Sequence, residues 1–202
     1  QNTNTEEITM TLPSLQLNMD RIYPFTGKNG AKKNAIQKTG LTYSMKGENR
    51  INTTDEFFFK KQMFDEAKSG LQHNISMNTN MKALKYFTIS PSVTYKDVWY
   101  FDRINKTFDD VQNAVVTDTI SSFSRFNEYS TAVSLGTTFY GMFKFKKGSK
   151  IEAIRHVVRP SVSYSYRPDF SGYNEEVQNS ADPNDIIEYS PFSNGIYGSP
   201  GT

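Results

Sequence analysis

The stretch from Phe126 to Pro168 constrains the fold most, because its side chains alternate in character over a long distance. In its first half, the odd-numbered positions carry Tyr129, Thr131, Val133, Leu135, Thr137, Phe139 and Gly141. The even-numbered positions carry mostly small or polar residues. After the polar link at 146–150 the alternation resumes. A period of two residues is that of a β-strand. We therefore predict a long hairpin with strands at about 126–145 and 151–168.

These two predicted strands are too long for an ordinary globular sheet. Ordinary globular strands are most often about 5 to 6 residues long, and a tilted membrane-spanning strand needs about 9 to 11. Length and alternation together are typical of a membrane barrel wall, with one face toward lipid and the other toward a wet interior. We expect an all-β fold, namely an antiparallel up-and-down transmembrane β-barrel of which this chain supplies about six strands.

Four further segments show the same alternation. In the clearest of them Leu71, His73, Ile75 and Met77 alternate with Gln72, Asn74, Ser76 and Asn78. One face of that segment is so polar that only a wet environment suits it. The four predicted strands are 8–20, 35–46, 70–81 and 86–97, and the whole chain, 1–202, is interpreted as one partial outer-membrane β-barrel domain.

The links between the predicted strands alternate in length. Those after the first, third and fifth strands are short, whereas the others each exceed 20 residues. Outer-membrane barrels have short periplasmic turns and long extracellular loops. We therefore expect loops on the extracellular side at 47–69, at 97–124 and from Asp169 onward, the first of which could alternatively be a short extension of the neighbouring strands. Since a membrane barrel needs at least about eight strands, we expect the others to come from the rest of a longer polypeptide.

The composition is compatible with a membrane barrel and excludes some other classes. A mean hydropathy of −0.62 and the lack of a long apolar run exclude a transmembrane helix. The 15 Phe and 12 Tyr fit aromatic girdles at the membrane surfaces, although ordinary β-rich packing would give the same numbers. A net charge of +2 gives no reason to expect nucleic acid as a partner. The absence of cysteine excludes disulfides and thiolate metal sites.

Two prolines fall within predicted strands, and their surroundings are similar. Pro91 lies in the segment Ser-Pro-Ser-Val-Thr-Tyr, and Pro160 lies in Arg-Pro-Ser-Val-Ser-Tyr. Proline removes a ladder hydrogen bond and is normally confined to sheet edges or bulges. We interpret both as structural prolines in bulges that bend the wall. The alternative is deliberate weakening of strand pairing in a wall that must flex.

The segment 155–168 resembles the C-terminal barrel of the LptD family, the outer-membrane lipopolysaccharide-assembly proteins also known as organic solvent tolerance proteins. That family carries a proline followed by a Tyr-x-Tyr-x-Pro segment ahead of a long extracellular loop. Pro160, Tyr164, Tyr166 and Pro168 hold those places here. The segment 12–17 also resembles a Leu-Pro-x-Leu strand start of the family.

The resemblance implies a location in the cell outer membrane and a function in inserting lipopolysaccharide into its outer leaflet. It implies as partners lipopolysaccharide, a plug lipoprotein of the LptE type, a periplasmic lipopolysaccharide-transport bridge and the outer-membrane lipids. Two other functions remain open from the residues alone. One is a porin or transporter for small solutes, and the other is a soluble β-rich surface or adhesion module, which the low hydropathy favours.

Basic residues on the predicted wet face are the candidate substrate-binding residues. They are Arg155, Arg159, Arg167, Lys144 and Lys96. Arginine pairs with phosphate and carboxylate groups through two parallel hydrogen bonds, so these residues suit a phosphorylated or carboxylated glycolipid. The alternative is that the charges only solvate a water-filled interior.

No pattern in the sequence indicates catalysis or a metal site. His73 and His156 both fall on the predicted lipid face, without a nucleophile elbow or metal-ligand spacing around them. The acidic residues Asp109, Asp110 and Asp118 lack the spacing of a calcium loop. We therefore predict that the protein is not an enzyme and needs no cofactor or metal.

Overall fold

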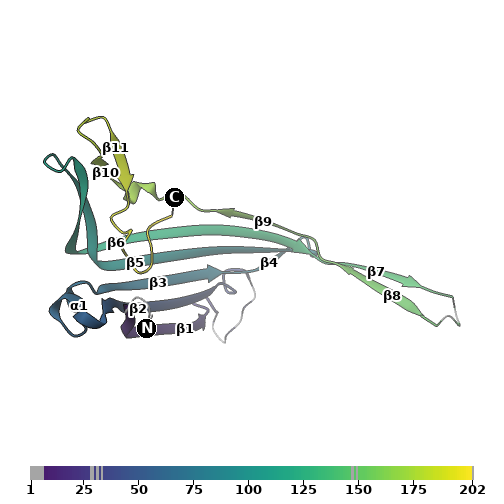
Figure 1. Cartoon of the computed structure of the whole chain (residues 1–202). Coiled ribbons are helices and arrows are strands. Elements are labelled where there is room, and N and C mark those ends of the chain that lie inside the picture. Colours follow the sequence, from purple (N-terminus) through teal and green to yellow (C-terminus); the bar gives the residue numbers. More distant parts are fainter. Residues whose placement is uncertain are drawn as a thin grey trace.

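The computed structural model describes residues 7–27, 30, 32, 34–146, 148 and 150–201. Within these residues the strands are antiparallel and form one seven-stranded sheet and two two-stranded sheets (Figure 1). The main sheet has the order β1-β2-β3-β5-β6-β9, and β4 pairs with β5 beyond the end of β3. None of the helices in the described residues is long and apolar enough to cross a membrane. The prediction of an antiparallel all-β fold is confirmed.

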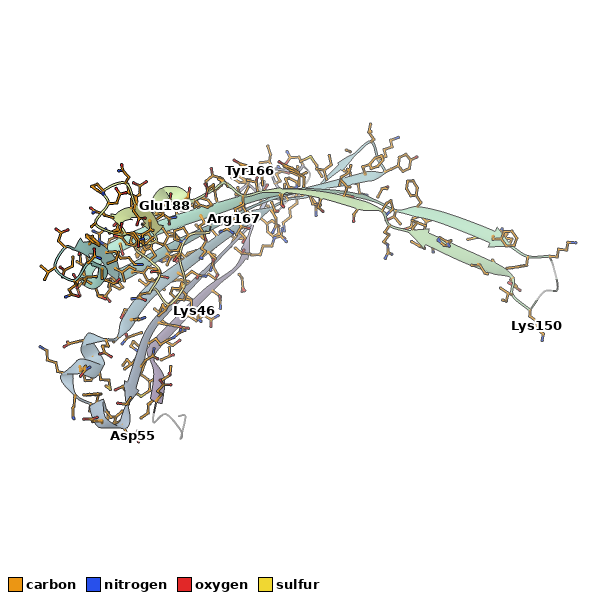
Figure 2. The ribbon with its side chains drawn as sticks, turned by 45° about the horizontal axis from the view of Figure 1, so that its top comes forward. Lys46, Asp55, Lys150, Tyr166, Arg167 and Glu188 are labelled. Carbon is orange, nitrogen blue, oxygen red and sulfur yellow. The ribbon has the colours of Figure 1, made fainter. Side chains whose placement is uncertain are left out.

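The main sheet consists of β1 (Glu7–Ile22), β2 (Gly40–Thr54), β3 (Lys68–Asn78), β4 (Met81–Ala83), β5 (Phe87–Asp109), β6 (Ala114–Thr137) and β9 (Ser161–Tyr166). The smaller sheets pair β7 (Phe139–Lys144) with β8 (Ala153–Val158), and β10 (Glu175–Gln178) with β11 (Ile186–Tyr189). The described part of the chain also contains the short helices η2 (Asp55–Phe57), α1 (Lys61–Asp65) and η3 (Ser171–Tyr173). In the described part of the chain β1 and β9 are unpaired edges, so the main sheet is a curved trough and is not closed (Figure 2).

The long hairpin at 126–168 is present, but it is divided into four strands. β6 pairs with β9 and β7 pairs with β8 in the same continuous register, with Thr131 opposite Tyr166 and Phe139 opposite Val158. The division falls at Thr138 on one side and at Arg159-Pro160 on the other. Beyond it, β7 and β8 project past the end of β5 as an arm, with Lys150 near its tip (Figures 1 and 2).

The expected loop at 97–124 is wrong, because this segment continues the two longest strands. β5 has 23 residues and β6 has 24, and they pair up to Asp109 and Ala114. The turn between them is tight, since Asp109 Oδ1 accepts hydrogen bonds from the backbone N–H groups of Val111 at 2.8 Å and Gln112 at 3.2 Å. Polar composition suggested a loop here, but the segment is paired strand, and Val98, Tyr100 and Ile104 within it are buried.

Other strand ends also differ from the predictions. The strand predicted at 35–46 begins at Gly40 and runs to Thr54, so part of the expected loop at 47–69 is strand. The helices η2 and α1 occupy the remaining link to β3. The link between β1 and β2 spans 23–39 and is therefore longer than the short turn that we predicted. Hydrogen-bonded neighbours extend a strand beyond what its own alternation indicates.

The two faces of the main sheet differ as the alternation predicts. Cross-strand pairs on one face, which we call the outer face, include exposed apolar residues such as Val133 beside Tyr164 and Leu135 beside Val162. The opposite, inner face carries small hydroxyl residues, as in the pair Ser134 and Ser163. The C-terminal segment 169–201, which we call the cap, folds back over one end of the inner face (Figure 1).

The buried core lies between the cap and the long strands. Its larger cluster contains Val98, Tyr100 and Phe126 from β5 and β6, with Phe192 from the cap. A second cluster joins Ile104 of β5 to Val177 and Tyr189 of the β10–β11 hairpin. The predicted loop from Asp169 onward is therefore a folded unit that packs against the sheet.

Neither proline lies in a bulge. Pro91 is opposite Val133 in an unshifted ladder between β5 and β6, and its carbonyl accepts the N–H of Thr79 at 3.2 Å. The N and O atoms of a strand residue point to the same side, so the nitrogen of Pro91 also faces the gap between β3 and β4. The N–H that proline lacks therefore costs the pairing with β6 no hydrogen bond. Pro160 lies between β8 and β9, outside any strand, and its carbonyl accepts the N–H of Thr137 at 3.2 Å.

Candidate functional site

Two charged regions occupy different ends of the inner face. The first, which we call the ion cluster, consists of Lys96, Glu128 and Arg167 and lies under the cap. The second, which we call the cationic basin, contains Lys82, Lys85 and Arg159 around an open hollow near the base of the arm. A third group of charges on the same face, Lys46, Glu48 and Arg50 of β2, pairs within itself.

The ion cluster is built around one buried carboxylate. Glu128 on β6 is 7% exposed and stands opposite Lys96 of β5 in the strand register. Lys96 Nζ lies 3.2 Å from Glu128 Oε2, and the guanidinium of Arg167 pairs with Oε1. The backbone N–H of Gly201 donates to the same Oε1 at 2.7 Å. A buried carboxylate needs such donors to offset its lost hydration, so the cluster fixes the end of the cap to the wall.

Aromatic packing next to the ion cluster holds the rest of the cap. The Tyr100 hydroxyl donates to the carbonyl of Gly198 at 2.8 Å and accepts the N–H of Tyr197 at 2.9 Å. The cap backbone passes so close to this ring that a methyl group at Gly195 would overlap it. Burial raises the pKa of Tyr197 to about 12, so its hydroxyl stays protonated and donates to the carbonyl of Lys46 at 3.1 Å.

The cationic basin begins from a row of residues across four strands. Lys82 of β4, Thr88 of β5, Gly136 of β6 and Ser161 of β9 are successive register partners on the inner face. Because Gly136 has no side chain, the floor of the hollow is open there. The hollow measures about 540 Å³ and is also lined by Lys85 and Arg159.

The charges of the basin have no acidic partner in the part of the chain that the structure describes. Lys82, Lys85 and Arg159 form no ion pair with any residue that the structure describes. The described lining contains no acidic residue and offers the hydroxyl groups of Thr88, Thr138, Ser161, Tyr86 and Tyr140. Three cations and several hydroxyl groups around one hollow are suited to binding an oxygen-rich anion.

The turn that carries Lys85 is held in an uncommon backbone conformation. Leu84 has φ of +50° and Lys85 has φ of +66°, in the left-handed region that favours glycine. The Thr137 side chain donates to the carbonyl of Tyr86 at 2.7 Å and ties the turn to β6. Residues in this region persist where their surroundings impose it, often at functional sites. The turn therefore places Lys85 at the basin against its backbone preference.

The five predicted substrate-binding residues fall in three places. Lys96 and Arg167 belong to the ion cluster, and Arg159 belongs to the basin. Lys144 and Arg155 lie on the arm, where the Arg155 guanidinium lies 4.6 Å from the centre of the Tyr140 ring. The register places these side chains on one face of the wall. Arg159 shares its hollow with Lys82 and Lys85 and with no acidic residue among those described, whereas Lys144 lines a hollow at the arm with Lys146 and Glu152. A role of the five in substrate binding stays a prediction.

Sequence reasoning missed Glu128, Lys82 and Lys85. Glu128 lies on the face of β6 where most alternate positions carry small residues, and it is the one acidic residue on that face of the predicted strand, so the sequence could have indicated it. Lys82 and Lys85 fall in the short link between the strands predicted at 70–81 and 86–97, and only the pairing of β4 with β5 places Lys82 beside Thr88. Knowledge of the register, rather than of composition, would have found the basin.

The histidines are held in different surroundings. His73 Nδ1 lies 2.8 Å from the Tyr43 hydroxyl, and its ring centre lies 4.5 Å from that of Trp99. His156 of β8 is opposite Gly141 on the arm. Within the described residues no group of three or more His, Cys, Asp and Glu side chains could hold a metal ion.

A comparison with protein families gives one match. A family model described as LptD protein matches residues 1–202, which is the whole chain. No curated protein and no solved structure matches the chain significantly.

Proposed function

Because the chain belongs to the LptD protein family, we propose that it is part of an outer-membrane β-barrel that inserts lipopolysaccharide into the outer leaflet. The family match supports an involvement in lipopolysaccharide transport and an outer-membrane location. The proposal adds the direction of delivery and the residues that face the passing lipid. It also includes the partners expected from the family, namely an LptE-type plug and a periplasmic transport bridge.

The observation that carries the proposal is the difference between the two faces of the wall. The outer face exposes apolar side chains such as Val93, Val133 and Tyr164, which suit contact with acyl chains. The inner face presents serines and threonines between the ion cluster and the basin, as at Ser134 and Ser163. Lipopolysaccharide has an acyl part and an anionic saccharide part, so a wall with one apolar and one wet, cationic face suits its passage.

The proposal requires the open sheet to be completed by further strands. Among the described residues, β1 and β9 have a strand neighbour on one side only, so the backbone N–H and C=O groups along their other edges lack strand partners. Within a bilayer each unpaired group costs several kcal/mol, and a closed barrel removes that cost. We propose that strands from the rest of the polypeptide pair with β1 and β9.

Crosslinking at two neighbouring residues of β9 tests the proposal. Ser163 lies on the inner face opposite Ser134, and Tyr164 lies on the outer face opposite Val133. A photo-crosslinking residue is placed at one or the other position in the full polypeptide in cells. We expect lipopolysaccharide adducts at position 163 that require ongoing transport, and only bulk membrane lipid at position 164.

Crosslinking, together with carbonate extraction of the membranes, separates the rival functions. A protein that stays in the outer membrane but forms no lipopolysaccharide adduct at either position would contradict the assembly function and favour a porin or transporter. A protein that is released from membranes by carbonate extraction would favour the surface-module alternative. Equal lipopolysaccharide adducts at both positions would contradict the assignment of the inner and outer faces.

A further inference from the structure

We propose that Lys82, Lys85 and Arg159 form a binding site for a phosphate group of a phosphorylated glycolipid, at the end of the inner face opposite the cap. The inference rests on the proposed function for the identity of the lipid, and on the geometry of the basin for its phosphate. The basin residues Lys82 and Lys85 are not among the five cations that the sequence indicates. Their placement comes from the pairing of β4 with β5 and from the left-handed turn that follows β4.

The uncompensated charge of the basin is the first reason. Three cations line one hollow of about 540 Å³, and none of them pairs with a carboxylate in the described residues. Cations held near each other repel, so a bound anion would relieve that repulsion. A phosphate monoester carries a charge of about −1.5 to −2 at neutral pH and has three acceptor oxygens. It therefore matches three cationic donors better than a single carboxylate does.

The second reason is the chemistry of the remaining lining. Arg159 can bind two phosphate oxygens at once through its planar guanidinium, and the two lysines act as point charges. Around them Thr88, Thr138 and Ser161 offer hydroxyl groups, and Tyr86 and Tyr140 offer both rings and hydroxyl groups. Hydroxyl groups can donate to and accept from the hydroxyl groups of a sugar. The lining thus suits a phosphate that is attached to a saccharide.

The third reason is the open floor at Gly136. A Cβ atom at this position would meet its nearest neighbours, the Pro160 carbonyl oxygen and Ser161 Cβ, at 3.8 Å, which is ordinary contact. The glycine is therefore not required by crowding, and its φ is not in the left-handed region. What the missing side chain provides is space above the floor, between Thr88 and Ser161. A larger residue would fit the strand but would occupy the hollow.

Titration of the purified full polypeptide tests the site. The probes are lipopolysaccharide, phosphatase-treated lipopolysaccharide and phosphatidylglycerol in the same mixed micelles. We expect removal of phosphate to weaken binding by about tenfold or more, because a charge-assisted contact is worth about one power of ten. The double variant K82Q/K85Q should weaken the binding of intact lipopolysaccharide by a similar factor and should no longer distinguish the treated form.

Matched variants separate charge, shape and folding. K60Q/K61Q removes the same charge from the short-helix region, away from the basin, and should bind as the wild type does. Gly136→Val keeps all three cations and fills the floor, so it should weaken binding about as much as K82Q/K85Q does. Arg159→Lys should keep part of the affinity that Arg159→Gln loses, since lysine retains the charge but not the two-point contact.

The outcomes distinguish this inference from the proposed function. If K82Q/K85Q binds no more weakly than K60Q/K61Q, or if phosphatase treatment has no effect, the phosphate site is wrong, whatever crosslinks form at position 163. If phosphatidylglycerol binds as tightly as lipopolysaccharide and depends equally on Lys82 and Lys85, the assignment to a glycolipid is overturned. If position 163 yields no lipopolysaccharide adduct while phosphate-dependent binding persists, the proposed function fails and the anion site stands.

Discussion

The ion cluster and the cationic basin lie on the same face of the same strands, yet their cations meet different surroundings. In β6 the cluster has Glu128, and the basin has Gly136 on the same parity of the strand. The glutamate pairs with both Lys96 and Arg167 and binds the cap through Gly201. The glycine leaves Lys82 and Arg159 beside an open hollow. The residue that β6 presents thus decides whether neighbouring cations hold the protein together or are available to a ligand.

The largest expected effect comes from removing the aromatic core beside the ion cluster. Phe126 is fully buried, with its ring centre 4.9 Å from that of Phe192 in the cap. Replacing a buried phenylalanine by alanine costs about 3 to 5 kcal/mol. We therefore expect Phe126→Ala to accelerate local opening of the cap by more than about a hundredfold. Amide hydrogen exchange at Gly195, whose N–H donates to the carbonyl of Phe192 at 2.8 Å, measures this opening.

Phe123→Ala is the control for that variant. Phe123 lies on the same strand but on the outer face, and it is 59% exposed. Its loss should change exchange at Gly195 by less than about tenfold, since exposed substitutions usually cost under about 0.5 kcal/mol. Equal effects of the two variants would contradict the view that the cap is held from the inner face. Lipopolysaccharide binding at the basin should survive both changes.

The second prediction converts the basin into a copy of the ion cluster. Gly136→Glu places a carboxylate on the floor between register partners Thr88 and Ser161, where Lys82 and Arg159 are near. We expect binding of phosphorylated lipopolysaccharide to fall by about a hundredfold, because the new carboxylate both pairs with a basin cation and repels phosphate. Gly136→Gln has nearly the same volume without the charge and should lose less. If the two variants bind equally, space rather than charge governs the basin.

The third prediction weakens the ion cluster without removing its shape. Gln at position 128 can still accept the N–H of Gly201 but cannot neutralise Lys96 and Arg167. These side chains are 26% and 52% exposed, so solvent screens part of the loss. We expect Glu128→Gln to destabilise attachment of the cap by about 1 to 2 kcal/mol. The measurement is hydrogen exchange at the Gly201 amide.

Glu48→Gln is a matched control for this effect. Glu48 also pairs with two cations, Lys46 and Arg50, and it lies near Tyr197 of the cap, but the amide of Gly201 donates to Glu128 instead. Exchange at Gly201 should therefore change in the Glu128 variant and stay near the wild-type rate in the Glu48 variant. Added salt should accelerate exchange in the wild type more than in Glu128→Gln. The opposite order would contradict a role of the ion cluster in holding the cap.

Much of the fold was predictable from the sequence because strand alternation is a local signal. The hairpin of β6 to β9, its register and its two different faces follow from residues that are near one another in the chain. The extension of β5 through Ile104 was not predictable, because Val177 and Tyr189, the residues that bury Ile104, lie far away in the sequence. The cap was interpreted as a loop for the same reason.

The site was predictable only in part, because charge and parity do not specify partners. Parity placed Lys96, Arg159 and Arg167 on one face, as the register does. Parity alone therefore suggested the same role for all three cations. In the structure Glu128 pairs with Lys96 and Arg167, and Arg159 has no acidic partner among the described residues. A partner on another strand depends on register, and Lys82 meets Thr88 only because β4 folds back on β5. Such contacts between strands are the part that local patterns omit.

The smallest expected effect concerns the turn that carries Lys85, and it separates stability from binding at the basin. A non-glycine residue in the left-handed region costs about 1 kcal/mol, and asparagine tolerates that region better than leucine or lysine does. Leu84 is 82% exposed, so Leu84→Asn should stabilise the turn by about 0.5 to 1 kcal/mol and leave lipopolysaccharide affinity unchanged.

Substitutions of Lys85 compare the stability of the turn with lipopolysaccharide affinity, and they also remove a basin charge. Lys85→Asn should stabilise the turn and weaken lipopolysaccharide binding, whereas Lys85→Gln should weaken binding equally without the gain in stability. Stability is measured as the temperature above which the protein no longer migrates on a gel as the unheated, folded form does. Lipopolysaccharide affinity is measured by micelle titration. If Lys85→Asn stabilised the protein with full affinity, the uncommon backbone would serve packing alone. A loss of affinity in both variants, with stability raised only by asparagine, would mean that the turn sacrifices stability to place a cation at the basin.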